Sequence, residues 1–140
     1  MVGMDFSDGA IRALEYALEH AKAIGANIAC VHAYEDGPGT PAYHDPAAAI
    51  HEQLKEVIAL RTPSTYNVRV DPVVRRGPPW EKLANVATEL GADLIVVGSD
   101  GQRGVAGGGL LGTVASRLVT TSPRSVVVVP SRSHLDRGAS

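Results

Sequence analysis

The amino-acid sequence predicts an α/β fold: a single-domain, open, parallel five-stranded sheet of the Rossmann-like type, with helices on both faces. Short aliphatic runs alternate with amphipathic segments, and parallel strands need such segments as crossover connections. Apolar residues make up 44% of the sequence but aromatic residues only 4%, which is typical of a buried aliphatic sheet. A length of 140 residues suits one domain, so we expect residues 1–140 to form a single domain.

Five strands and four helices follow from this patterning. In chain order we expect a strand at 2–4, a helix after the polar residues 5–8, a strand at 27–34, a helix starting at Asp45-Pro46, a strand across 68–74, a helix after Gly77-Pro78-Pro79, a strand at 93–97, a helix through 114–119 and a strand at 125–129. Gly25 and Gly91 stand where left-handed residues would end the first and third helices. Trp80 is expected to pack at the start of the third helix.

One predicted strand contains a proline. Pro72 lacks the N–H that a central strand would donate, so we expect this strand at an edge of the sheet or with a bulge. The segment 35–46 is expected to be a loop, and the polar tail 131–140 is expected to fray. Because the first strand is unusually short, we expect the natural chain to begin earlier.

Composition and charge exclude several classes of function. The formal net charge is −2 and no run of Lys or Arg is present, so no nucleic-acid partner is expected. The longest apolar runs are too short to span a membrane, and no export signal is visible, so we expect a cytoplasmic protein. The single Cys30 lies in an apolar strand, which indicates a core thiol. His44 and His51 are seven residues apart, which is not a metal-ligand spacing.

Glycines are concentrated in one segment of the chain. Seven of the fifteen fall between Gly98 and Gly112, directly after the strand at 93–97 and before the fourth helix. In open α/β sheets, ligands bind outside the carboxyl ends of the strands, and glycines there let the backbone approach a ligand closely. Amides at the start of the next helix can hold phosphate, with the Thr113 hydroxyl as an added donor. The alternative is a flexible surface loop.

Two common nucleotide-binding motifs do not fit this segment. Residues 107–112 match a dinucleotide glycine pattern, but they lie nine residues beyond the strand instead of forming the strand-to-helix turn. The same residues followed by Thr113 imitate a P-loop without its lysine, so the main cation for the β and γ phosphates is missing. The segment therefore favours neither a dehydrogenase nor a P-loop ATPase.

Nearly the whole chain resembles the universal stress protein family. The resemblance rests on Gly98-Ser99-Asp100-Gly101, Gly112-Thr113, the closing Val126 to Pro130, Gly3-Met4-Asp5-Phe6-Ser7 and Val31-His32-Ala33. It implies strand order 3-2-1-4-5 and a homodimer formed through the final strand, Ser125 to Val129. That strand is an apolar edge of the sheet, and soluble proteins usually cover or pair such an edge. The resemblance also implies an ATP-binding regulatory protein of the stress response, with slow or no hydrolysis, and not an enzyme with catalytic residues.

The nucleotide-binding branch of that family implies a set of ligand contacts. They are Gly3, Met4 and Asp5 at the adenosine, Ala33 and Val97 along the adenine, and Gly98, Gly101, Gly112, Thr113 and Val114 around the phosphates. Asp5 would lie near the ribose or near a phosphate bridged by magnesium or manganese. A helix-capping role is also a complete explanation of Asp5.

The glycine signature departs from that branch by one residue. The branch places nine residues between its second and third glycines, whereas ten separate Gly101 from Gly112 here. An extra glycine in residues 107–109 can be absorbed as a local bulge, which would leave the site in place. The alternative function is a dimeric interaction module of the same family that binds no nucleotide. An enzyme of the wider adenine-nucleotide α-hydrolase type is disfavoured, because the chain has no separate substrate-binding insertion.

Overall fold

The computed structural model describes residues 1–41, 43, 45–99 and 112–130. Within these residues, the backbone forms one parallel sheet of five strands in the order β3-β2-β1-β4-β5. The expected α/β fold and the strand order 3-2-1-4-5 are therefore confirmed. The expectations for Gly101, for residues 107–109 and for the tail 131–140 lie outside the described residues.

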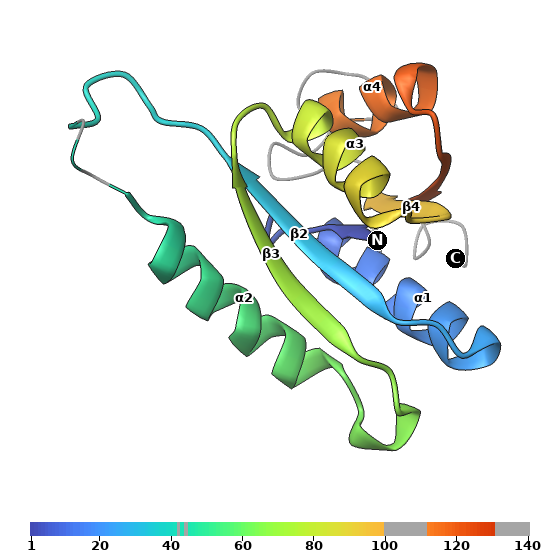
Figure 1. The fold of residues 1–140 in the computed structure, drawn as a ribbon. Helices are drawn as coiled ribbons and strands as arrows, with labels where there is room; N and C mark the ends of the chain where they lie inside the picture. The colour runs from blue at the N-terminus through green and yellow to red at the C-terminus, as the bar shows by residue number, and fades with distance from the viewer. Residues whose placement is uncertain (42, 44, 100–111, 131–140) are drawn as a thin grey trace, which may run out of the picture.

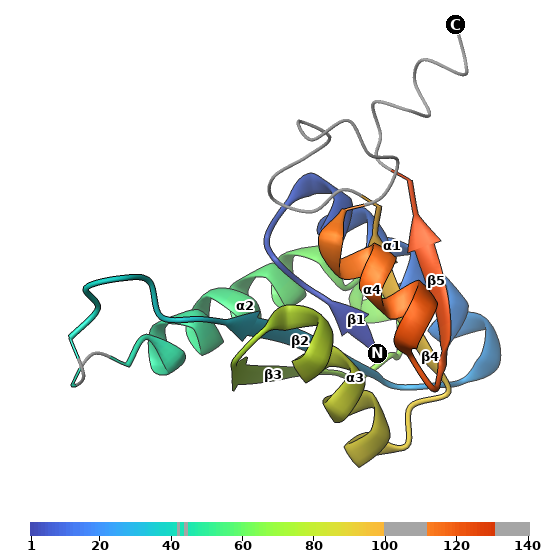
Figure 2. The same ribbon diagram turned by 90° about the horizontal axis from the view of Figure 1, so that it is seen from above.

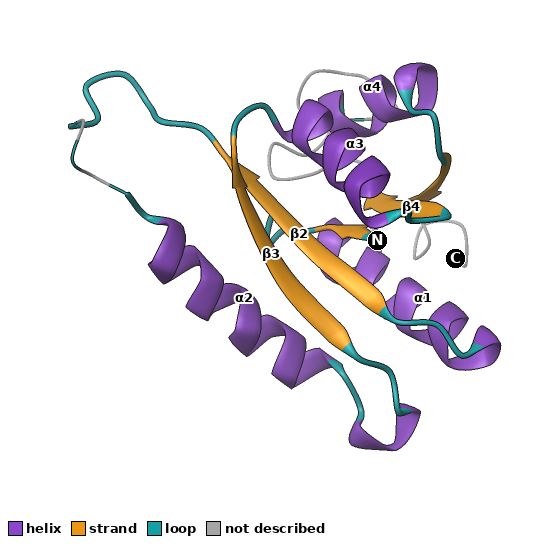
Figure 3. Cartoon of the chain, in the orientation of Figure 1, coloured by secondary structure: helices purple, strands orange, loops and turns teal. Residues whose placement is uncertain are grey.

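Helices and strands alternate along the chain (Figure 1 and Figure 3). In order they are β1 Val2–Gly3, α1 Asp8–Ile24, β2 Ile28–Tyr34, α2 Ala47–Arg61, β3 Val70–Arg76, α3 Pro79–Leu90, β4 Leu94–Gly98, α4 Thr113–Thr121 and β5 Ser125–Val129. A short 3-10 turn at Ser64–Tyr66 precedes β3, which begins at Val70 and not at the predicted Val68. Residues 35–41, after β2, project away from the sheet (Figure 2).

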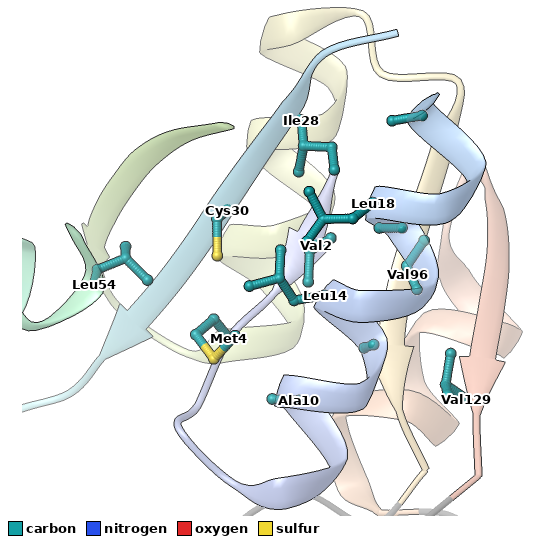
Figure 4. Close-up of a cluster of buried hydrophobic side chains, with 13 residues drawn as sticks. Val2, Met4, Ala10, Leu14, Leu18, Ile28, Cys30, Leu54, Val96 and Val129 are labelled. Carbon is teal, nitrogen blue, oxygen red and sulfur yellow. The ribbon is translucent and has the colours of Figure 1, made fainter. Parts of the chain in front are cut away.

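Helices cover both faces of the sheet. α1 and α2 pack on one face, and α3 and α4 pack on the other (Figure 1). Side chains alternate between the two faces along each strand: Cys30 and Val96 belong to the cluster on the α1 side, whereas their neighbours Val31 and Val97 belong to the cluster on the α3 side. Figure 4 shows the α1-side cluster, in which Leu14 and Leu18 of α1 lie against the sheet. The core is aliphatic, as the composition predicts. None of the described helices is long and apolar enough to cross a membrane.

Local signals at the helix ends are mostly confirmed. Gly25 and Gly91 adopt left-handed φ angles of 72° and 65° and end α1 and α3. Pro79 is the first residue of α3, where its missing N–H has no helical partner to lose. The prediction for α2 was wrong by one residue: Asp45 accepts a hydrogen bond from the Ala47 amide at 3.0 Å, but the helix begins at Ala47 and not at Pro46.

β3 is an outer strand, as Pro72 predicts, and it needs no bulge. Its register with β2 runs unbroken from Ile28 opposite Val70, through Pro72 opposite Cys30, to the end of both strands. The Ile28 amide donates to the carbonyl of Arg69 at 2.8 Å, and backbone groups alternate sides along a strand. The odd-numbered residues of β3 therefore bond to β2, and Pro72 faces outward, where its missing N–H costs no ladder bond.

Candidate functional site

A cavity of about 450 Å³ lies at the carboxyl ends of β1 and β4. The chain leaves β1 toward α1 on one face and leaves β4 toward α4 on the other, so the cavity occupies the point where the connections diverge. Nine of the ten predicted site residues line it: Gly3, Met4, Asp5, Ala33, Val97, Gly98, Gly112, Thr113 and Val114. The tenth, Gly101, lies outside the described residues. Segments distant in sequence thus meet at one cavity.

Asp5 is held in position by the turn between β1 and α1. Its Oδ1 accepts hydrogen bonds from both the amide and the hydroxyl of Ser7, the former at 3.0 Å. Phe6, between them, has a left-handed φ of 65°, which is uncommon for a bulky residue. Its ring lies 5.0 Å from that of His32, whose Nδ1 donates to the Met4 carbonyl at 2.7 Å. The turn therefore holds Asp5, which lines the cavity, in a fixed conformation.

The helix cap at this turn is Ser7 and not Asp5. Ser7 Oγ accepts from the Ala10 amide at 3.2 Å and closes the first turn of α1. The interpretation of Asp5 as the helix cap is therefore wrong, because Asp5 orients the side chain of Ser7 and Ser7 caps the helix.

The apolar floor of the cavity depends on a missing side chain. A Cβ atom on Gly3 would lie 2.9 Å from Leu83 Cδ1 and 3.1 Å from Val97 Cγ1. The absence of that atom lets Leu83 of α3 and Val97 of β4 close over β1, and both are buried on the α3 side of the sheet. Ala33, two residues beyond the buried Val31 on the same side of β2, adds a small wall.

Two predicted site residues have mainly structural surroundings. The Met4 side chain points into the α1-side core (Figure 4), its amide donates to the Val31 carbonyl at 2.8 Å, and its carbonyl accepts from His32. Gly98 lies against the backbone of the first turn of α1, with no room for a side chain. Both residues line the cavity, but packing alone accounts for their identities.

The first turn of α4 borders the cavity opposite Asp5. Gly112 occupies the N-cap position with extended backbone angles, and no described side chain caps the helix. Thr113, Val114 and Ala115, which follow it, all line the cavity. The first amides of a helix have no intrahelical acceptor and carry the positive end of the helix dipole, so this wall suits an anionic group.

The charges on the described lining are negative. Asp5 and Glu35 contribute carboxylates, and no Lys or Arg is among the described lining residues. Nearby, Arg76 forms an ion pair with Asp36, with Nη2 and Oδ2 2.5 Å apart, beside the cavity and not in it. The described residues contain no cluster of three His, Cys, Asp or Glu side chains that could hold a metal by itself.

Sequence reasoning missed half of the lining. The additional residues are Ser7, Ala10, Val31, Glu35, Pro78, Pro79, Trp80, Leu83 and Ala115. Pro78, Pro79 and Trp80 lie just past β3, whose carboxyl end shares the sheet edge with the other parallel strands. That shared edge is the signal in the sequence that could have indicated them.

Cys30 has no part in this site. It is fully buried on the α1 side of the sheet, and burial raises the pKa of its thiol to about 12. The interpretation of Cys30 as a core residue is confirmed.

Comparisons with known proteins agree on one family. The sequence profile of the Universal stress protein family matches residues 1–130. A universal stress protein of Thermus aquaticus is 33% identical over 132 residues, which cover 92% of this chain and 96% of that protein. Among solved structures, a universal stress protein in complex with cAMP is similar with a TM-score of 0.69 and 29% identity, covering 92% of this chain and 93% of that one. The universal stress protein from Archaeoglobus fulgidus in complex with dAMP is similar in fold, with a TM-score of 0.68, 23% identity and coverage of 91% and 94%.

Proposed function

Because the chain belongs to the universal stress protein family, we propose that it binds ATP in the cavity at the carboxyl ends of β1 and β4 and acts as a regulatory protein with slow or no hydrolysis. The observation that carries this proposal is the convergence of three segments on one cavity: Asp5 after β1, Ala33 near the end of β2, and Gly112 to Val114 at the start of α4. Each was expected at a nucleotide site from the resemblance to the nucleotide-binding branch of the family.

The chemistry of the walls suits the parts of a nucleotide. Ala33, Val97 and Leu83 form an apolar region that accepts a planar base. The amides at the start of α4 suit phosphate. Asp5 lines the same cavity, and a carboxylate there can accept hydrogen bonds from ribose hydroxyls. The complexes of similar proteins with cAMP and dAMP support an adenine nucleotide as the ligand class.

A divalent cation would complete the site for a triphosphate. Asp5 and Glu35 give the described lining a negative charge, which opposes the binding of free ATP⁴⁻. Magnesium or manganese bound to the phosphates reduces that repulsion, and Asp5 is the residue best placed to share such a cation. ATP affinity should therefore rise when magnesium is added.

Titration calorimetry with ATP, with and without magnesium, tests the proposal directly. We expect saturable heat at submillimolar ATP with magnesium, and unchanged ATP by chromatography after hours with the protein. The absence of heat at millimolar ATP with magnesium would refute nucleotide binding and would favour the interaction module as the function.

We also propose a homodimer formed through β5. This strand is at the end of the described sheet, and Val126 to Val128 are only half-buried in the single chain. An aliphatic edge strand of this kind invites pairing with another strand. Antiparallel pairing with a second copy across a twofold axis would satisfy both edges at once.

A further inference from the structure

Trp80 is an aromatic wall of the cavity. It is the second residue of α3, it lines the cavity, and it is half-buried. Among the described lining residues it is the one aromatic side chain, since Phe6 packs against His32 instead. The packing expected at the start of this helix therefore brings a planar ring to the proposed nucleotide site.

The position of Trp80 follows from the stripe of α3 that faces the sheet. Leu83 and Ala87 belong to the buried cluster on this side, and Trp80 lies three residues before Leu83, on the same helix face. α3 runs opposite in direction to the strands, so each earlier residue of the stripe lies nearer to their carboxyl ends. Leu83 lies against Gly3 at the end of the short β1, and Trp80 lies one turn farther out. The ring therefore continues the apolar stripe beyond the sheet.

Two features fix the ring in place. Pro78 and Pro79 restrict the backbone at the start of α3. Arg117 of α4 places its guanidinium 5.1 Å from the centre of the Trp80 ring. A cation over the ring covers one side of it and holds α3 and α4 together beside the cavity.

We infer that Trp80 contacts the nucleobase by stacking, with Arg117 as its positioning residue. This inference rests on the proposed function. Ala33 is the small residue of β2 on the side of the sheet that α3 covers, and Trp80 is the large planar residue at the start of that helix. A small residue and a large planar residue that line one cavity leave space there for a flat ring. Stacking on an aromatic side chain stabilises a base and adds little to the binding of a bare phosphate chain.

The test compares ATP with inorganic tripolyphosphate, which lacks the base, on wild-type protein and on Trp80 variants. Trp80→Leu should weaken ATP binding about tenfold or more, while Trp80→Phe, which keeps an aromatic ring, should stay within about threefold of wild type. Affinity for tripolyphosphate should be equal in all three proteins. Tyr16→Leu, which removes an exposed aromatic residue of α1, is the matched control and should leave ATP binding unchanged.

Fluorescence provides a second measurement that needs no variant, because Trp80 is the single tryptophan. With excitation at about 295 nm, ATP should quench its emission in the wild-type protein, and tripolyphosphate should not. ATP binding by calorimetry without quenching, equal ATP affinity of Trp80→Leu, or an equal loss of tripolyphosphate affinity in that variant would each overturn the inference while leaving the proposed function intact. If wild-type protein binds no ATP by calorimetry, the proposed function itself fails.

Discussion

A Cβ atom placed on Gly98 would lie 2.7 Å from the backbone carbonyl carbon of Gly9. The end of β4 and the first turn of α1 thus approach each other backbone to backbone, and neither has a side chain that could rotate away. We expect Gly98→Ala to lower the free energy of unfolding by about 1–3 kcal/mol, because the added methyl group must push α1 from the sheet. Denaturant unfolding followed by circular dichroism measures this loss.

Gly37→Ala is the matched control for that experiment. Its added Cβ would lie 3.8 Å from Thr40 Oγ1, an ordinary contact, so the same chemical change should alter stability by less than about 0.5 kcal/mol. Equal stabilities of the Gly98→Ala and Gly37→Ala proteins would contradict the close approach of β4 and α1.

Gly112 offers a test of the proposed phosphate-binding wall. Gly112→Val should abolish ATP binding, because the branched side chain would enter the cavity at the start of α4. Gly112→Ser is the matched control: serine is favoured at an N-cap and is smaller, so α4 should be at least as stable and ATP affinity should be largely kept. Calorimetry measures affinity, and circular dichroism verifies that both variants are folded. Strong ATP binding by folded Gly112→Val would place the phosphates elsewhere.

Cys30 should be unreactive in the folded protein. Its pKa of about 12, against an ordinary value near 9, means that about one thiol in ten thousand is ionised at pH 8. A disulfide reagent such as Ellman's should release one equivalent rapidly in denaturant and almost none from the native protein. Because folding keeps the thiol neutral, the unfolded state binds fewer protons than the folded state above about pH 9. The free energy of unfolding should therefore decline between about pH 9 and about pH 12. Cys30→Ala should lack that component of the decline. Rapid native labelling at pH 8 would contradict the buried environment.

The dimer proposal can be tested at a single amide. The Ser99 amide donates to the Val129 carbonyl at 3.0 Å, and backbone groups alternate sides along β5, so Val127 bonds to β4 while Val128 faces the open edge. Val128→Pro should remove a donor needed by a partner strand and shift the mass measured by light scattering toward the monomer, with the fold intact. Val127→Pro should instead break the ladder to β4 and destabilise the fold. A wild-type monomer at tens of micromolar would refute the dimer.

Much of the fold could be predicted because its signals are local. Gly25 and Gly91 mark helix ends through their own backbone preference, and Pro72 marks an edge through its own missing donor. The predicted start of α2 is wrong by one residue. The hydrogen bond from the Ala47 amide to the Asp45 carboxylate suits a helix that begins at Pro46 and also one that begins at Ala47, so it does not distinguish them. Element ends depend on such small differences, whereas the strand order was expected from the family resemblance and is confirmed.

The site was only half predictable, because a cavity wall is a tertiary property. Asp5 and Thr113 could be placed from their positions after β1 and before α4. Glu35 and Trp80 carry no motif, and they reach the cavity because the carboxyl ends of β2 and β3 share its edge of the sheet. Gly98 both lines the cavity and packs against the first turn of α1, and a glycine needed for a close helix contact looks the same along the chain as one needed for a ligand.

Pro72 sets a limit on how many copies can join through this sheet. Its outward position leaves the free side of β3 without one of the donors that a continuous ladder requires, so this side is a poor template for another strand. If β5 pairs with β5 of a second copy, both competent edges are consumed and the two terminal strands of the joined sheet are both β3. Such a dimer has no competent edge strand left for a third copy, so the contact that forms the pair cannot propagate into a fibre.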